Sequence, residues 1–374
     1  MSMNGHGKNI RVIIAGGGTG GHLFPGVAIA EEFMRRNSET RVLFVGTERG
    51  LEARVLKDIG LPLETIDVAG IRGKGIMESV RGVWKIPRSM LQSYTIIKQF
   101  DPRIVIGVGG YASGPVVMMA RMTGKKTAIA EQNALPGVTN KILGKIVDRI
   151  FLTFADTTGV FPADKVLISG NPVRSSFLSE SREDTERDAR TLTLLIYGGS
   201  QGAAGINRAV VEGLPYLHDV RDSLRIIHQT GTHDLDMVHD AYAAHGISGD
   251  VVPFIHDMAS VYSEADLLVC RAGATTIAEI TVSGKAAVLI PFPYAVGDHQ
   301  TLNARVLVDA GAALMIREQD LSGEKLAVII KDLLCDRGRI REMEARSRRL
   351  GNAHAAADIV DECMKLTEET GPTT

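Results

Sequence analysis

The sequence predicts an α/β protein built from two doubly wound, parallel-sheet domains. Short β-branched runs alternate with longer amphipathic stretches, glycine-rich turns follow several runs, and the pattern restarts near the middle of the chain. Strands buried on both faces read as continuous apolar runs, and helical connections between them imply parallel pairing. The chain has 374 residues, which is too long for one ordinary core and suits two domains.

Twelve apolar runs are expected to form strands. In the first half they are Arg11–Ala15, Arg41–Val45, Ile104–Val108, Thr127–Ala130, Ile150–Thr153 and Val166–Ser169. In the second half they are Leu192–Tyr197, Leu224–Gln229, Val251–Phe254, Leu267–Cys270, Ala287–Pro291 and Ala313–Arg317. The uncharged run Ile104–Ala120 is shorter than the roughly 20 residues of a membrane span and is broken by glycines. We therefore interpret it as a buried strand, a turn and the start of a helix.

A domain boundary is visible after the segment "GNPVR", Gly170–Arg174. A charged stretch, Ser179–Arg190, follows it, and then the strand–glycine–helix pattern begins again. We expect residues 1–173 to form the first domain and residues 174–351 the second. A C-terminal helix of about residues 352–374 is expected to pack back on the first domain.

Composition excludes some classes of protein. Lys and Arg number 42 against 44 Asp and Glu, and this balance argues against a general nucleic-acid binder. Cys270, Cys335 and Cys363 lie far apart, which argues against a disulfide framework and a cysteine zinc site. This cysteine usage makes a reducing cytosol the expected compartment. Residues 1–9 lack the apolar segment of a secretory signal.

The first glycine turn, "GGGTGG" at Gly16–Gly21, satisfies G-x-G-x-x-G after the first expected strand. Glycines let backbone N–H groups approach a diphosphate, and the following helix N-terminus adds partial positive charge. A dinucleotide site would also place an acidic residue at the end of the second strand. Here Gly46 and Thr47 occupy that end, and Glu48, the nearest acidic residue, lies beyond it. The alternative is that these glycines only permit close packing of helix on strand.

Three more turns of this type follow later strands. In "GVGGYASGP", Gly107–Pro115, Ser113 and Gly114 are expected to start a helix with Pro115 at its first position. In "GGSQGA", Gly198–Ala203, Ser200 is placed to donate a hydroxyl hydrogen bond to phosphate.

The fourth turn is "CRAGATTIAEI", Cys270–Ile280. Thr275 and Thr276 are candidates for phosphate, and Glu279 lies about one helical turn later, where a carboxylate can accept both hydroxyls of a ribose. The alternative is an ordinary helix-surface glutamate. Two such turns in each half provide more phosphate capacity than one nucleotide needs, and they predict a cleft with phosphates approached from both domains.

Together, eight segments resemble the MurG group of glycosyltransferase family 28 and lie in family order from residue 16 to residue 304. They are "GGGTGGHLFPG", "GGYASGP", "EQNALPGVTNK", "GNPVR", "GGSQGA", "FIHDM", "CRAGATTIAE" and "PFPYAVGDHQTLNA". The resemblance implies the GT-B fold, in which two Rossmann-like domains face each other across a cleft. It also implies an inverting transfer of GlcNAc from UDP-GlcNAc to the 4-hydroxyl of undecaprenyl-diphospho-MurNAc-pentapeptide, lipid I, which gives lipid II for peptidoglycan.

Two alternatives remain open. One is another UDP-sugar enzyme of the same fold, such as a UDP-GlcNAc 2-epimerase or a glycolipid glycosyltransferase. The other is a non-catalytic nucleotide-binding module or an NAD-binding protein. Glu279 and the Gln300–Asn303 stretch favour a sugar nucleotide, and the ending of the second strand disfavours NAD.

The resemblance also implies site residues. Ser200 meets the donor diphosphate, the main chain of Ile255 meets uracil, Glu279 takes the ribose, and Gln300 with Asn303 reads sugar hydroxyls. The further implied donor-binding residues are Thr19, Gly20, Gly21, Asn133, Arg174, Gly273, Ala274, Thr275, Thr276, Ile277 and Ala278. The implied acceptor-binding residues are Gly18, Gly109, Gly110, Tyr111 and Ser113, so that the first loop serves the diphosphate of a lipid carrier or lies where both diphosphates converge.

The implied reaction needs a base for the acceptor hydroxyl and stabilisation for departing UDP. His22 is the candidate base, because an imidazole can take up a proton near neutral pH; alternatively it bonds the backbone or positions the acceptor. Glu131 is the competing carboxylate, and its alternative role is to shape its loop through backbone hydrogen bonds. No cofactor is expected to be required. Although "DLD", Asp234–Asp236, matches a metal–nucleotide pattern, we interpret it as a helix start and expect no tightly bound divalent metal.

The segment "IRGKGIMESVRGVWKIPRSM" is a candidate membrane contact. One helix face is expected to carry Ile76, Val80, Val83 and Trp84. The cations around it are Arg72, Lys74, Arg81, Lys85 and Arg88. A basic rim with an aromatic anchor suits anionic headgroups, whereas the alternative is that the stripe packs into the core. We expect a peripheral enzyme on the cytoplasmic face of the bacterial inner membrane. Its expected partners are UDP-GlcNAc, the undecaprenyl-linked acceptor and possible wall-synthesis enzymes, and no nucleic acid.

Overall fold

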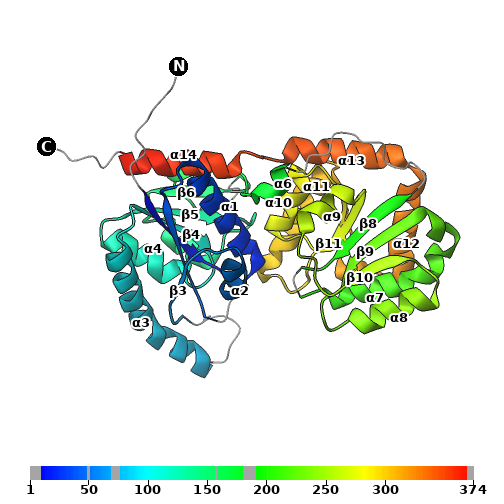
Figure 1. Ribbon diagram of the computed structural model, residues 1–374, viewed down its shortest axis with the longest axis horizontal. Coiled ribbons are helices and arrows are strands. Elements are labelled where there is room, and N and C mark those ends of the chain that lie inside the picture. Colours follow the sequence, from blue (N-terminus) through cyan, green and yellow to red (C-terminus); the bar gives the residue numbers. More distant parts are fainter. Residues whose placement is uncertain are drawn as a thin grey trace, which may run out of the picture. The chain divides into compact units, whose positions relative to one another are not determined.

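The computed structural model describes residues 10–48, 51–68, 76–155, 158–179, 191–199 and 201–368, without the side chains of residues 51, 54, 76–85 and 296. The chain divides into two compact units (Figure 1). Unit 1 holds Met1–Arg174 together with Ala353–Thr374, and unit 2 holds Ser175–Asn352.

In the described part of unit 1, seven strands form one sheet in the order β3-β2-β1-β4-β5-β6-β7, and all neighbouring strands are parallel. The strands are β1 (Arg11–Gly16), β2 (Arg41–Gly46), β3 (Leu63–Thr65), β4 (Ile104–Gly109), β5 (Lys126–Glu131), β6 (Arg149–Leu152) and β7 (Val166–Ile168). The chain moves outward from β1 in one direction and then returns to start again at β4, which makes the sheet doubly wound.

Helices cover both faces of this sheet. They are α1 (Gly20–Arg36), α2 (Leu51–Asp58), α3 (Ile76–Phe100), α4 (Ser113–Met122), α5 (Val138–Leu143), the 3-10 helix η1 (Ala163–Lys165) and α14 (Ala355–Glu368). Val12 and Ile14 of β1 pack in one apolar cluster with α1 and α14, and Ile13 and Ala15 pack in another with α3 and α4. Because side chains alternate along a strand, full burial of all four residues identifies a strand covered on both faces.

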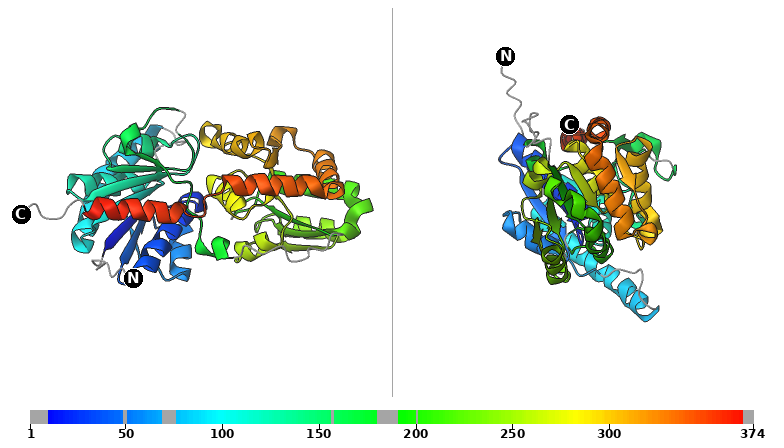
Figure 2. Two further views of the ribbon diagram at one scale, coloured as in Figure 1. Left: turned by 90° about the horizontal axis from the view of Figure 1, so that it is seen from above. Right: turned by 90° about the vertical axis from the view of Figure 1, so that its right-hand side faces the viewer.

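The last helix of the chain belongs to unit 1. Its residues Ile359, Val360 and Cys363 lie in the same apolar cluster as α1, and Figures 1 and 2 show α14 beside that helix. Arg36 of α1 forms an ion pair with Asp361, and this guanidinium holds the pKa of the Asp361 carboxyl below its usual range.

In the described part of unit 2, six parallel strands form a sheet in the order β10-β9-β8-β11-β12-β13. They are β8 (Leu192–Tyr197), β9 (Leu224–Gln229), β10 (Gly249–Val252), β11 (Leu267–Cys270), β12 (Ala286–Leu289) and β13 (Ala313–Met315). This sheet is doubly wound in the same sense as the first, with β8 and β11 in the places of β1 and β4.

The helices of unit 2 are α6 (Ser175–Ser179), α7 (Ala204–Gly213), α8 (Leu235–Ala244), α9 (Met258–Glu264), α10 (Ala274–Val282), α11 (His299–Asp309), α12 (Gly323–Cys335) and α13 (Arg337–Leu350). The 3-10 helices are η2 (Leu214–Ser223), η3 (Val296–Asp298) and η4 (Glu318–Asp320). One apolar cluster joins β8 to α7, α8, α12 and α13 through residues such as Leu194, Ile206, Val238 and Ile330.

The predicted fold class, two doubly wound parallel sheets, is confirmed, although β12 and β13 end at Leu289 and Met315, two residues earlier than expected. Three other differences concern β10, β3 and α4. The tenth strand ends at Val252 rather than Phe254, because Pro253 has no N–H to donate to a ladder. The short β3 was not expected, since its side chains are mostly exposed. Helix α4 begins at Ser113, so Pro115 stands third rather than first. Within the described residues, no helix combines the length and apolarity that crossing a bilayer requires.

Candidate functional sites at the two sheet switch points

All four predicted glycine turns follow the strands at which the two sheets change direction. In unit 1 the turns come after β1 and β4, which are neighbours at the centre of the sheet, and in unit 2 they come after β8 and β11. Ligands of open α/β sheets bind outside the carboxyl ends of the strands at such a switch point. Each unit therefore has one candidate ligand site, built from two turns.

In unit 1 the two turns touch each other through their backbones. The Gly17 amide donates to the Gly109 carbonyl at 3.3 Å. A Cβ added to Gly16 would lie 2.3 Å from the Gly109 oxygen, and one added to Gly110 would lie 2.4 Å from the Gly17 oxygen. Glycine is required here because any side chain would separate the two turns.

One backbone amide of the first turn already donates to a side chain of the protein. The Gly18 amide donates to Oε2 of Glu52 at 2.7 Å. Within the described residues no group accepts a hydrogen bond from the amides of Thr19 or Gly20, which stand at the N-terminus of α1. The amides of this turn that are available to an anion are therefore those of Thr19 and Gly20, while acceptor contact by Gly18 stays a prediction.

His22 lies in the first turn of α1, and its ring is held by Gln132. The ring Nδ1 is 3.2 Å from Oε1 of Gln132, and Nε2 of Gln132 donates to the Val108 carbonyl at 3.1 Å. Because the Val108 carbonyl takes the amide N–H, the oxygen of Gln132 faces the ring, and Nδ1 must carry the proton. This leaves Nε2 of His22 with a lone pair, which is the form that a general base needs.

Glu131 is 3 % exposed and is bound to its own loop. Its Oε1 accepts from the amide and the side chain of Asn133 at 3.0 and 3.4 Å. Its Oε2 accepts from the Gly137 amide and from Asn140 Nδ2, each at 2.9 Å. These bonds favour the loop-shaping role for Glu131 over a role as base.

The remaining predicted residues of unit 1 differ in exposure. Tyr111 is 56 % exposed, whereas Ser113 is fully buried and its Oγ packs against Gly107 of β4, where an added Cβ would lie 2.3 Å away. Arg174 is half-buried, and its guanidinium lies 4.3 Å from the ring centroid of Phe24. Gly20 and Gly21 are the first two residues of α1.

In unit 2, helix α10 begins directly after β11 and the turn Arg271–Gly273. Gly273 is extended, with φ −65° and ψ 148°, and α10 starts at Ala274. The first amides of a helix have no partner within it, so those near Thr275 and Thr276 lie where an anion could be bound, while phosphate contact stays a prediction. Glu279 is 7 % exposed, which excludes the ordinary helix-surface glutamate. Ile277 and Ala278 are buried in the same helix.

Gln300 and Asn303 of α11 both bind the turn that precedes α10. Oε1 of Gln300 accepts from the amides of Ala272 and Phe292 at 3.2 and 2.9 Å. Asn303 is fully buried, and its Nδ2 donates to the Ala272 carbonyl at 3.2 Å. The structure thus places Asn303 as a support of this turn, while sugar contact by either residue stays a prediction.

A glutamine at the end of β9 joins two more predicted donor segments. Nε2 of Gln229 donates to the Gly199 carbonyl and Oε1 accepts from the Ile255 amide, both at 2.8 Å. Gln229 is 1 % exposed, so these bonds are shielded from water. The Ile255 main-chain group left for a uracil is its carbonyl. Ser200, predicted for the diphosphate, lies outside the described residues.

Asp234 and Asp236 stand at the start of α8, as expected for a helix start. Oδ2 of Asp234 accepts from Asn207 Nδ2 at 2.7 Å, which ties the α8 start to α7. Over the described ranges, no cluster of three or more His, Cys, Asp or Glu residues could hold a metal ion.

The predicted membrane contact falls mostly on residues without described side chains. Arg72 and Lys74 lie outside the described residues, and so do the side chains of Ile76, Val80, Arg81, Val83, Trp84 and Lys85. The backbone of α3 runs through the segment from Ile76, which agrees with the expected helix. Arg88 is exposed, and its Nη1 lies 3.8 Å from Oδ2 of Asp67.

Sequence reasoning missed the three buried side chains that hold these turns, Glu52, Gln132 and Gln229. Gln132 stands inside the quoted segment "EQNALPGVTNK", and Gln229 ends an expected strand, so position was an available signal for both. No sequence signal indicated Glu52, because Gly18, whose amide it binds, lies 34 residues away in the chain.

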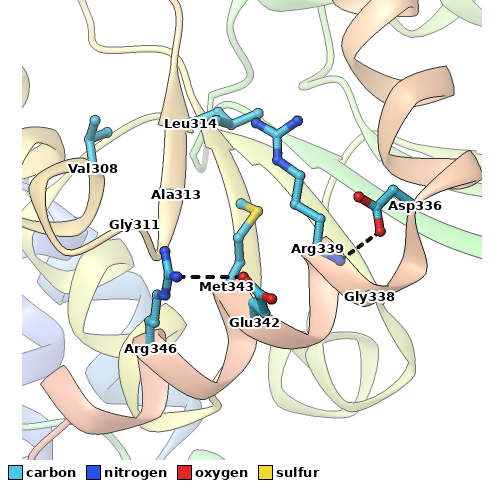
Figure 3. Close-up of a pocket in the computed structure, with 10 residues that line it drawn as sticks. All are labelled: Val308, Gly311, Ala313, Leu314, Asp336, Gly338, Arg339, Glu342, Met343 and Arg346. Carbon is cyan, nitrogen blue, oxygen red and sulfur yellow. Dashed lines mark hydrogen bonds and ion pairs between the residues drawn. The ribbon is translucent and has the colours of Figure 1, made fainter.

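Unit 2 also has a pocket of about 530 Å³ between the α11–β13 connection and α13 (Figure 3). Arg346 pairs with Glu342 at 3.5 Å, and Asp336 accepts from the Arg339 amide at 3.0 Å; Figure 3 draws both contacts as dashed lines. The pocket contains none of the predicted site residues. It lies at the amino end of β13, whereas ligand sites of such sheets lie at the carboxyl ends.

Comparison with known proteins gives consistent matches along the chain. The model of the glycosyltransferase family 28 N-terminal domain matches residues 12–152, and that of the family 28 C-terminal domain matches residues 193–363. A UDP-N-acetylglucosamine--N-acetylmuramyl-(pentapeptide) pyrophosphoryl-undecaprenol N-acetylglucosamine transferase of Syntrophus aciditrophicus is 57% identical over 96% of this chain and 99% of its own.

Solved structures are also similar to nearly the whole chain, and two examples differ in their sequence identity. MurG of Acinetobacter baumannii has a TM-score of 0.76 and 33% identity, covering 95% of this chain and 99% of that one. A UDP-N-acetylglucosamine 2-epimerase has a TM-score of 0.68 but only 12% identity, covering 98% and 99%. The second likeness shows the fold alone.

Proposed function

The chain belongs to glycosyltransferase family 28, and on this premise we propose that it transfers GlcNAc from UDP-GlcNAc to lipid I to form lipid II. The observation that carries the proposal is the 57% identity, along nearly the full length of both chains, to a transferase named for this reaction. Two doubly wound sheets with paired turns at both switch points fit a GT-B enzyme that handles two diphosphates.

The transfer is a single displacement with inversion. The 4-hydroxyl oxygen of the muramyl sugar forms a bond to the anomeric carbon of GlcNAc, and the bond from that carbon to the UDP oxygen breaks. The hydroxyl proton passes to a base, for which Nε2 of His22 is the proposed atom. The Gln132 contact supports this assignment because it keeps the proton on Nδ1.

The donor is assigned to unit 2. Amides at the start of α10 are proposed to meet the UDP diphosphate, with Ser200 as a further hydroxyl donor, and the buried Glu279 is proposed to accept the ribose hydroxyls. Backbone amides, Ser200, Thr275, Thr276 and Arg174 are proposed to stabilise the leaving diphosphate, without a tightly bound metal.

The acceptor diphosphate is assigned to the turns of unit 1. The resemblance implies Thr19 and Gly20 for the donor, but we propose that their amides, with the backbone of Gly109 and Gly110, contact the acceptor diphosphate, because the first turn packs directly against the implied acceptor turn. We further propose that the first part of α3 brings the enzyme to the cytoplasmic face of the inner membrane, because the acceptor carries an undecaprenyl chain.

Transfer of labelled GlcNAc from UDP-GlcNAc to a short-chain lipid I analogue tests the function. We expect a product whose formation needs both substrates, with UDP released in equal amount, and little transfer from UDP-glucose. Conversion of UDP-GlcNAc to its 2-epimer without an acceptor, or no transfer at all, would overturn the proposal.

A further inference from the structure

A buried carboxylate holds the first glycine turn of unit 1 in its observed conformation. Glu52, in the first turn of α2, is 1 % exposed. Its Oε2 accepts from the Gly18 amide at 2.7 Å, and its Oε1 accepts from the amide and the hydroxyl of Thr47, both at 2.9 Å. One side chain thereby connects the turn after β1 to the residue that follows β2.

The space for this carboxylate is made by two glycines. A Cβ on Gly17 would lie 2.6–2.8 Å from the Glu52 carboxylate atoms, and a Cβ on Gly46 would lie 2.8 Å from its Cγ. Real side-chain atoms do not approach so closely, so a residue with a side chain at either place would displace the carboxylate. Gly17, directly after β1, and Gly46, the last residue of β2, therefore serve the placement of Glu52 as well as the shape of the turn.

The peptide between Gly17 and Gly18 is held from two sides. Its N–H points to Glu52, and its carbonyl lies against Gly110, where an added Cβ would be 2.4 Å from the oxygen. Both glycines have positive φ, +136° and +89°, and glycine exchanges between such conformations at little cost. Without an acceptor for the Gly18 N–H, this peptide would have no polar contact to keep it from rotating.

The orientation of the Gly17–Gly18 peptide determines the position of Thr19 and of the N-terminus of α1. Thr19 follows it directly, and the Thr19 carbonyl accepts from the amides of His22 and Leu23 at 3.2 and 3.1 Å, which starts α1. A rotation at Gly17–Gly18 would turn the amides of Thr19 and Gly20 and move the first residues of the helix that carries His22.

We propose that Glu52 is a positioning residue for glycosyl transfer, which holds the Gly17–Gly18 peptide so that the Thr19 and Gly20 amides and the His22 ring are set for the acceptor. This rests on the proposed function. Glu52 does not meet substrate itself, because its carboxylate is buried and is bonded on both oxygens to this turn and to Thr47.

The test compares Glu52→Gln with Thr47→Val. The glutamine keeps the size of the side chain but turns one acceptor into an NH₂ that faces a donor, Gly18 N–H or Thr47 N–H. The valine removes the hydroxyl bond to Oε1 and leaves the Gly18 contact in place. We expect Glu52→Gln to lower kcat/KM for the lipid I analogue by about 10- to 100-fold, as for a displaced reacting group, and Thr47→Val to stay near the wild type.

Two further measurements separate positioning from a general loss of structure. The KM for UDP-GlcNAc and the stabilisation of the protein by UDP should change little in Glu52→Gln, since the donor is assigned to unit 2. Hydrogen exchange of peptides covering residues 16–22 should be faster in Glu52→Gln than in Thr47→Val. If Glu52→Gln does not fold, Glu52→Asp replaces it under the same criteria, because the shorter side chain cannot reach both Gly18 and Thr47.

The proposal would be overturned if Glu52→Gln kept the wild-type kcat/KM, or if Glu52→Gln and Thr47→Val lost kcat/KM equally. It would also be overturned if the kinetic constants for UDP-GlcNAc and for the lipid I analogue worsened equally in Glu52→Gln. These results are distinct from a failure of the proposed function, which would show as a wild-type protein that transfers no GlcNAc.

Discussion

The ring Nδ1 of His22 lies 3.2 Å from Oε1 of Gln132, and the amide of Gln132 is itself oriented by the Val108 carbonyl. The two hydrogen bonds form a chain in which each donor has one acceptor. A histidine held in this way presents the same unprotonated nitrogen whenever it is neutral, so the contact sets the chemistry of the ring and not only its position.

His22→Ala should lower kcat strongly, by about 10²- to 10⁴-fold if the ring is the base. Binding of UDP-GlcNAc, measured by calorimetry, should persist because the donor is assigned to unit 2. Near-normal turnover would remove His22 from the base role.

Gln132→Met should reduce kcat in the wild type but add little in the His22→Ala background. The methionine fills a similar volume without an acceptor for Nδ1–H, so its effect depends on the ring being present. Rates of the two single variants and the double variant measure the coupling. Effects that simply multiply would show that Gln132 does not act through His22.

Glu131→Gln should weaken folding more than chemistry. The carboxylate accepts from two backbone amides and two side-chain amides, and an amide in its place leaves buried donors without acceptors. Such a loss costs about 1–3 kcal/mol, visible as a lower urea midpoint. A stable variant with kcat reduced a hundredfold would instead make Glu131 the base.

Gln229→Met should raise the KM for UDP-GlcNAc while the KM for the acceptor stays near the wild type. The glutamine joins Gly199, which directly precedes the predicted diphosphate contact Ser200, to Ile255, which is predicted to meet the uracil. Initial rates at varied donor concentration measure the effect, which we expect to be about tenfold for two lost buried bonds. A change in the KM for the acceptor alone would contradict a role of Gln229 in donor binding.

Acid should destabilise unit 2 through His228. This residue is fully buried, with Nε2 3.1 Å from Asn207 Oδ1 and Nδ1 3.2 Å from the Tyr242 hydroxyl, and burial lowers its pKa to about 3. The unfolded chain takes up this proton below about pH 6.5 and the folded chain does not, so stability falls as pH drops from about 6.5 toward 3. Between pH 7 and pH 5 the contribution is about 2 kcal/mol.

Urea midpoints of the wild type and of His228→Gln at pH 7 and pH 5 measure this loss of stability. The variant should be less stable at pH 7 but lose less on acidification, whereas the exposed control His239→Gln should follow the wild type. An equal loss in His228→Gln would exclude the buried ring as the cause.

Anionic liposomes should float the protein, and the double variant Lys74→Ala/Lys85→Ala should float less. A basic rim is worth about 1 kcal/mol per cation near an anionic surface. Lys98→Ala is the matched control, because it removes a cation from the exposed part of the same helix α3, away from the stripe. No dependence on anionic lipid would contradict the membrane contact.

Local patterns predicted most of the fold. Apolar runs such as Leu267–Cys270 and the glycine turns after β1, β4, β8 and β11 are properties of neighbouring residues, and both sheets follow from them. The end of β10 could have been predicted from Pro253. The short β3 could not, because an exposed edge strand has no apolar alternation.

The site was predicted where it depends on motifs and missed where it depends on contacts across the chain. Glycine turns and His22 are visible in the sequence. The bond from Gln132 to His22 joins residues that are 110 positions apart, so the motif that contains Gln132 marks the residue but does not indicate its partner. The sequence likewise did not indicate that the buried Asn303 donates to the Ala272 carbonyl and so supports the turn before α10.

The return of α14 to unit 1 has a consequence for synthesis. Unit 2 is one continuous stretch, Ser175–Asn352, but unit 1 includes Ala353–Thr374. A ribosome therefore releases every residue of the second unit before the first has its last helix. Until then the apolar positions of α1 that later meet Ile359 and Val360 stay uncovered. The unit that begins the protein is the one completed last, and a chain shortened at its C-terminus would harm the domain made at the start.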